Sequence, residues 1–91
     1  MPGKFSLGQV VATPGALEAL ENAGQTPLEF LQRHAAGDWG DVKEEDRQEN
    51  EDALVHGFRL LSVYTTRLGE TIWVMTEADR SSTTFVLPHE Y

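Results

Sequence analysis

Two short stretches of the sequence combine side chains that could do acid–base, metal-binding or anion-binding chemistry. The first holds an imidazole, an indole and two carboxylates: His34, Asp38, Trp39 and Asp41. On a continuous helix His34 and Asp38 would share one face, at a spacing that suits two ligands of a metal ion. Gly37 argues against a continuous helix, and the alternative is structural. In it His34 lies at a helix C-terminus, Asp41 caps the next helix, and Trp39 fills the core or contacts a partner.

The second stretch holds carboxylates, a guanidinium and hydroxyls: Glu77, Asp79, Arg80, Ser81 and Ser82. These groups could form an acid–base site or a small anion pocket. They are also what a polar turn contains, with Asp79 bonding forward into the loop. The chain has no G-x-S-x-G elbow and no H-E-x-x-H helix. An enzyme is therefore the alternative function: a small hydrolase or nuclease with a site near the 34–41 loop and the 77–82 turn, formed by His34, Asp38, Asp79 and Arg80.

The third feature is an acidic segment. Between Asp38 and Asp52 eight acidic side chains stand against Lys43 and Arg47, whereas the rest of the 91 residues carries seven acids and five bases. Most of the net charge of −8 thus lies in one segment. One interpretation is a solvated helix face that keeps the protein soluble. The other is a surface for a basic partner, either a protein groove or the phosphate channel of a nucleic-acid enzyme.

Composition excludes several classes of function. The negative field opposes binding to phosphate backbones, so we expect no direct nucleic-acid binding. The absence of cysteine rules out a thiol nucleophile and a cysteine-ligated metal. No apolar run approaches the roughly 18 residues of a membrane span, so we expect no membrane contact and a cytoplasmic location. We expect no cofactor, although Asp38 and Asp41 leave a weak divalent-cation site as a further alternative.

The elements that position these residues begin with two predicted short helices. Thr13-Pro14 is a helix start, and Gly24 is a helix stop. The same helix start and stop residues recur 13 residues later as Thr26-Pro27 and Gly37. Glu29 completes a T-x-x-E capping box there. The side chains between these marks differ, so the pattern predicts two successive helices and no repeat architecture.

A third helix is predicted from about residue 42 to His56. Asp41 and Glu44 form a D-x-x-E capping box, and Gly57 supplies the stop. The apolar residues of this helix are concentrated at 53–55. We therefore expect its first two turns to stand in water.

After the third helix the pattern changes to strands. Segments 58–66, 71–78 and 83–87 are rich in β-branched and aromatic residues and are separated by turn formers. Along the middle segment one face is more apolar and is expected to face the helices: Ile72, Val74, Thr76 and Ala78. The pattern predicts a single α+β domain over residues 1–91: a three-stranded antiparallel meander, with or without an added strand at Val10-Val11, covered on one face by about three helices.

Three stretches together resemble a known group of proteins: Thr13-Pro14-Gly15-Ala16-Leu17, His34 with Gly37 to Asp41, and Thr76 to Thr84 running on to Leu87-Pro88. They are similar to small uncharacterised bacterial proteins that are labelled plasmid-related. The resemblance covers nearly the whole chain and implies a bacterial protein borne on mobile elements. It transfers no activity or catalytic residue.

The leading functional hypothesis is a non-enzymatic protein-binding or accessory module. It follows from the concentrated acidic segment and the lack of a catalytic motif. The expected partner is a protein with a basic surface. The candidate binding residues are Asp38, Trp39, Asp41, Glu44, Glu45, Glu49, Asp52, Asp79 and Arg80.

Overall fold

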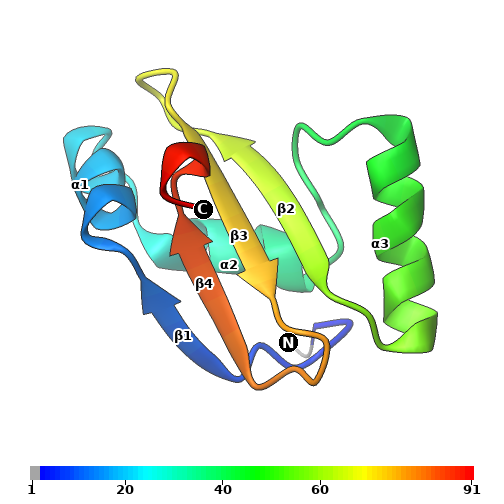
Figure 1. Ribbon diagram of the computed structural model, residues 1–91. Coiled ribbons are helices and arrows are strands. Elements are labelled where there is room, and N and C mark those ends of the chain that lie inside the picture. Colours follow the sequence, from blue (N-terminus) through cyan, green and yellow to red (C-terminus); the bar gives the residue numbers. More distant parts are fainter. Residues whose placement is uncertain (1–2) are drawn as a thin grey trace.

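The chain folds around a four-stranded mixed sheet (Figure 1). The computed structural model describes residues 3–91. The strand order is β1-β4-β3-β2, with β1 Gln9–Ala12, β2 Leu60–Thr65, β3 Thr71–Thr76 and β4 Ser82–Val86. The predicted antiparallel meander is β2-β3-β4, and β1 pairs with β4 in parallel. The α+β prediction is confirmed, and the N-terminal segment joins the sheet as an edge strand.

The structure describes three α-helices in residues 3–91: α1 Pro14–Asn22, α2 Pro27–Ala35 and α3 Glu44–His56. α2 crosses behind the sheet, and α3 stands beyond β2, at the edge opposite β1 (Figure 1). The main core joins α1 and α2 to the face of the sheet that the strand pattern assigned to the helices: Ala16, Ala19, Leu20, Phe30, Tyr64, Ile72, Val74 and Phe85. A C-terminal 3-10 turn, η1 Pro88–Glu90, follows β4.

Only one of the predicted side-chain caps of the first two helices forms. Thr13 Oγ1 accepts the backbone N–H of Ala16 at 3.1 Å, as the sequence predicts. Thr26 is the N-cap residue of α2, but its side chain makes no cap bond. The predicted box with Glu29 is therefore wrong, and the Glu29 carboxylate instead accepts a hydrogen bond from the side chain of Gln25 at 2.8 Å.

α3 begins slightly later than predicted, and its capping box is also wrong. The N-cap residue is Lys43, without a side-chain cap bond. The carboxylate of Asp41 accepts a hydrogen bond from the hydroxyl of Thr65 at 2.7 Å instead, so a tertiary contact replaces the local cap with Glu44. At the other end Gly57 adopts φ 77° and stops the helix as predicted.

The outer edge of β2 is occupied by the short segment 39–41. The C=O of Trp39 accepts the N–H of Val63 at 3.0 Å, and the N–H of Asp41 donates to the C=O of Val63 at 2.6 Å. Gly40, at the centre of this parallel bridge, has φ 75°, and a Cβ built there would lie 2.0 Å from the Val63 oxygen. Only glycine permits this approach, which holds the loop before α3 against the sheet.

Candidate functional site

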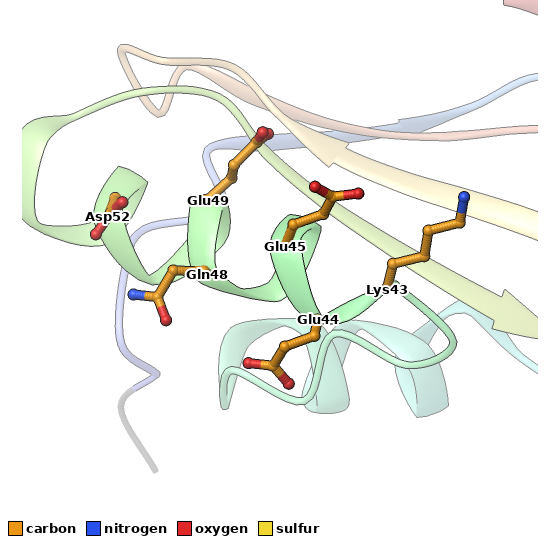
Figure 2. A pocket seen from close by; sticks show the side chains of 6 residues that line it. All are labelled: Lys43, Glu44, Glu45, Gln48, Glu49 and Asp52. Carbon is orange, nitrogen blue, oxygen red and sulfur yellow. The ribbon is translucent and has the colours of Figure 1, made fainter.

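The acidic segment forms an exposed surface on one helix. Four exposed carboxylates follow one side of α3, and we call them the acidic stripe: Glu44, Glu45, Glu49 and Asp52. Figure 2 shows them with Lys43 and Gln48, lining a shallow surface along this helix. From Glu44 to Asp52 they extend over roughly 12 Å of the helix axis. The Arg47 guanidinium donates a hydrogen bond to Glu44, which lowers the pKa of that carboxyl group.

The other side of α3 is anchored to the sheet. The Asn50 amide donates to the C=O of Leu61 at 2.7 Å and accepts the N–H of Leu61 at 3.1 Å. The indole N–H of Trp39 donates to Glu51 at 2.9 Å, and Trp39 packs with Ala53 in a second core cluster. Trp39 is 3% exposed, so its ring fills the core and presents no free surface. The anchoring fixes the direction in which the acidic stripe points.

The two carboxylates before α3 are each engaged by a neighbour. Asp38 accepts a hydrogen bond from Arg33 at 2.8 Å, which lowers the pKa of the Asp38 carboxyl group. The guanidinium of Arg33 also lies 4.5 Å from the ring centroid of Tyr64. Asp41 is bound by Thr65, as described above. Within residues 3–91, no three histidine or acidic side chains lie together in a group that could hold a metal ion.

His34 lies inside the protein and has no exposed area. Its Nδ1 is 2.5 Å from the hydroxyl of Ser62, and its Nε2 is 2.9 Å from the hydroxyl of Thr76. The Thr76 hydroxyl is 2.7 Å from that of Thr83. Thr83 in turn donates to the backbone C=O of Leu7 at 2.7 Å. The imidazole is therefore the centre of a buried hydrogen-bonded chain, which we call the histidine network.

The last acceptor of the histidine network sets the direction of every bond in it. The C=O of Leu7 can only accept, so the Thr83 hydroxyl donates to it and accepts from Thr76. The Thr76 hydroxyl then accepts from Nε2–H of His34. Nδ1 is left to accept from Ser62, so the neutral ring satisfies every partner. Burial lowers the pKa of His34 to about 4, and the imidazole is neutral at pH 7.

Asp79 and Arg80 build the turn between β3 and β4. Asp79 accepts the N–H of Ser81 at 3.0 Å, and hydrogen bonds from Ser81 lower the pKa of the Asp79 carboxyl group. This is the forward bond of the polar-turn interpretation. The Arg80 guanidinium donates to four backbone carbonyls, at 2.6 to 3.2 Å: those of Ala53, Phe58, Glu77 and Ala78.

The contact of Arg80 with Ala53 ties this turn to α3. Ala53 belongs to the last turn of that helix, where its C=O also accepts the N–H of Gly57 at 2.8 Å and where the helix dipole favours a cation. Arg80 thus acts on the acidic helix from its C-terminal end. The N–H groups of the Arg80 guanidinium donate to backbone carbonyls, so this side chain has a structural role.

Replacing Arg80 by Met is expected to loosen the C-terminal half of α3 and to cost about 2 kcal/mol of folding free energy, because charge-assisted hydrogen bonds are lost. Urea denaturation and amide hydrogen exchange of residues 51–56 would measure both effects. Arg67 is exposed and supplies a matched control, since Arg67→Met is expected to change neither quantity. Equal exchange in the two variants would contradict the assignment.

The predicted site residues do not converge on one place. The acidic stripe lies on α3, Asp38 and Asp41 lie in the loop before it, and Asp79 and Arg80 lie in the turn beyond its end. His34 is inside and points at hydroxyls of the sheet. Surface chemistry that combines the imidazole with these carboxylates has no geometric basis here.

Sequence reasoning missed the hydroxyl residues that hold His34. Ser62, Thr76 and Thr83 are each fully buried. The alternation of the strands could have revealed these three residues, because each hydroxyl residue occupies a helix-facing position beside apolar residues. Polar side chains at such positions need a partner, and His34 on the buried face of α2 bonds directly to Ser62 and Thr76.

Comparisons with known proteins found no matching family model, no matching curated protein and no matching solved structure. Within residues 3–91, no helix has the length and apolar character needed to cross a membrane.

Proposed function

We propose that this protein is a non-enzymatic binding module whose acidic stripe binds a basic surface of a partner protein. The observation that carries the proposal is the geometry of α3. Its inner side is fixed to β2 through Asn50 and to the core through Ala53. Its outer side presents the four exposed carboxylates of the acidic stripe, of which Glu44 is paired with Arg47.

For binding, the position of the carboxylates matters more than the total charge of the chain. At physiological ionic strength a charge is screened beyond about 8 Å, so a partner senses mainly the carboxylates within its own footprint. A rigid helix holds those of the acidic stripe at neighbouring positions, which reduces the entropy lost when lysines or arginines pair with them. Such contacts raise the association rate, and salt should weaken them.

The proposal includes the kind of partner. A stripe of carboxylates can occupy a basic groove of a protein, or the channel in which a nucleic-acid enzyme holds phosphates. The resemblance to plasmid-related proteins supports a bacterial partner, bound in an accessory interaction of a mobile element. The same negative field disfavours direct binding of DNA or RNA by this chain.

The alternative, a small hydrolase or nuclease, has less support. Its imidazole would be His34, whose two ring nitrogens are both hydrogen-bonded inside the core. Its guanidinium would be Arg80, which is bound to backbone carbonyls. Neither residue lines the shallow surface along α3.

Charge reversal tests the proposed function. Replacing all four residues of the acidic stripe by lysine is expected to abolish capture of the cognate partner from a bacterial lysate and to leave the circular dichroism spectrum unchanged. A matched control reverses four exposed acids elsewhere: Glu18, Glu21, Glu29 and Glu70. The two variants carry the same net charge, so a difference between them reports location.

A second readout avoids the unknown identity of the partner. Addition of a short oligolysine peptide is expected to shift the amide NMR signals of α3 in the wild type and in the control, and to leave those of the stripe variant unshifted. Competition of the captured partner by an oligonucleotide would identify a phosphate channel. Equal capture by both reversed variants would refute the proposal.

A further inference from the structure

The outer edge of β1 carries backbone groups without a partner in the sheet. β1 is paired with β4 on one side only, since it is the first strand in the order β1-β4-β3-β2. The N–H of Gln9 donates to Ser81 and the N–H of Thr13 donates to Phe85, each at 3.0 Å. In a parallel ladder alternate residues face the neighbour. The N–H and C=O groups of Val10 and Ala12 therefore point outward.

The opposite edge of the sheet is closed to such pairing. There the segment centred on Gly40 bridges to Val63 on the outer side of β2, and α3 stands beyond it (Figure 1). A strand that extended this sheet would thus add at β1. Three features that often protect an edge are missing from β1, since Gln9–Ala12 is short but contains no charge, no proline and no bulge.

The side chains of β1 carry no charge, and the carboxylate of Glu90 lies just beyond the end of the strand, where it accepts a hydrogen bond from Thr13 at 2.6 Å. Val10 and Val11 are 42% and 41% exposed, on opposite faces of the strand, and Leu17 of α1 is 40% exposed. No charged residue occurs from Phe5 to Leu17, in a chain whose net charge is −8.

We propose that β1 is a self-association edge, at which two copies of this chain pair antiparallel and join their sheets into one. The spacing of the outward groups is self-complementary. With Val11 on the two-fold axis, Val10 of each copy lies opposite Ala12 of the other, and each such pair exchanges two N–H···O bonds. Four backbone hydrogen bonds form, and the two Val11 side chains meet on the face of the sheet away from α2.

Charge selects a second copy as the occupant of this edge. A basic partner would be drawn to the acidic stripe, whereas the neutral edge offers no attraction for cations. Strands lie about 4.8 Å apart, so β2 is roughly 14 Å from β1, and the two α3 helices of the dimer lie farther still from the axis. That distance exceeds the screening length of about 8 Å, so the acidic stripes of the two copies do not oppose pairing here. A two-fold interface is also the commonest route to a homodimer.

Sedimentation velocity over a concentration series tests the pairing. The wild type is expected to approach twice the monomer mass of 10.1 kDa as its concentration rises. Val11→Lys is expected to remain monomeric, because it would place two ammonium groups against each other at the axis. The matched control is Val55→Lys, at an exposed position of α3, which is expected to dimerise like the wild type.

Amide hydrogen exchange provides a readout that does not depend on a variant. The N–H groups of Val10 and Ala12 are expected to be protected in concentrated wild-type protein and to exchange rapidly in Val11→Lys. The N–H of Val11, which faces β4, is expected to stay protected in both, showing that the strand remains folded. A wild type that is monomeric at millimolar concentration, a dimer that survives Val11→Lys, or rapid exchange at Val10 and Ala12 in the dimer would each overturn the proposal.

Discussion

Acidification from pH 7 to pH 4 is expected to lower the free energy of unfolding by about 3 kcal/mol through His34 alone. The folded protein holds this imidazole neutral, with its pKa lowered to about 4 by burial and then by the positive charge of Arg80, against an ordinary value of 6.5. Each unit of such a difference is worth about 1.4 kcal/mol. The imidazole of His34 has no exposed area, so screening by solvent reduces this free energy only slightly.

The sign follows from proton uptake. Below about pH 6.5 the unfolded chain binds a proton at His34, and the folded protein does so only near pH 4, so lower pH favours unfolding across that window. Above pH 6.5 the contribution is fully present. Carboxyl groups such as Asp38 and Glu44 also have a lowered pKa in the fold, but their contribution is lost at lower pH, below their ordinary values of 3.8 and 4.5. The fall between pH 6.5 and pH 5 therefore belongs to histidine.

Urea denaturation at a series of pH values between 7 and 5 would measure this slope. His34→Gln is expected to be less stable at pH 7, because Gln has no polar atom at the position of Nδ1 to accept from Ser62, but its stability should depend little on pH in this window. The matched control is His56→Gln, at an exposed position, which should keep the slope of the wild type. A slope that persists in His34→Gln would show that another group is responsible.

The arrangement of helices and strands was predictable because it depends on local signals. Thr13-Pro14 is a start that needs no tertiary contact, and its cap formed as expected. The alternation along β3 separated a helix-facing side from the other side, and the burial of Ile72 and Val74 agrees with it. The pairing of β1 with β4 depends on residues more than 70 positions apart, so no local pattern could specify it.

The candidate site was less predictable, because several polar side chains bond to residues far away in the sequence and not to their sequence neighbours. Asp41 has the spacing of a helix cap, yet it binds Thr65 on β2. His34 has the spacing of a ligand pair with Asp38, yet it binds hydroxyls of two strands. The position of the acidic stripe was better predicted, because exposed carboxylates need no partner and lie where the helix period puts them.

The two proposed surfaces occupy opposite edges of the sheet, and this has a consequence for binding. A dimer joined at β1 would carry its two acidic stripes at far ends, where each could engage a basic site independently. A partner with two such sites would then bind more tightly than a monomer allows. Val11→Lys and the stripe variant separate these effects, since the first removes pairing and the second removes charge.

Substitution of Gly40 by alanine is expected to destabilise the fold by about 3 kcal/mol or more, the largest effect of a single methyl group that we expect here. The position combines two costs. A left-handed backbone, at φ 75°, costs a residue with a Cβ about 1 kcal/mol. In addition, the new Cβ would lie 2.0 Å from the C=O of Val63, where backbone cannot yield without breaking the bridge to β2.

Gly57→Ala separates these two costs. Gly57 has nearly the same φ, 77°, but a Cβ there would meet nothing within 4 Å, so only the backbone cost of about 1 kcal/mol is expected. Urea denaturation of the two variants would give the steric cost as their difference. Because Trp39 immediately precedes Gly40, the steric loss should be accompanied by a change in near-ultraviolet circular dichroism in Gly40→Ala alone. Equal destabilisation in both variants would mean that the segment 39–41 yields freely, and that the loop before α3 does not fix the acidic stripe in place.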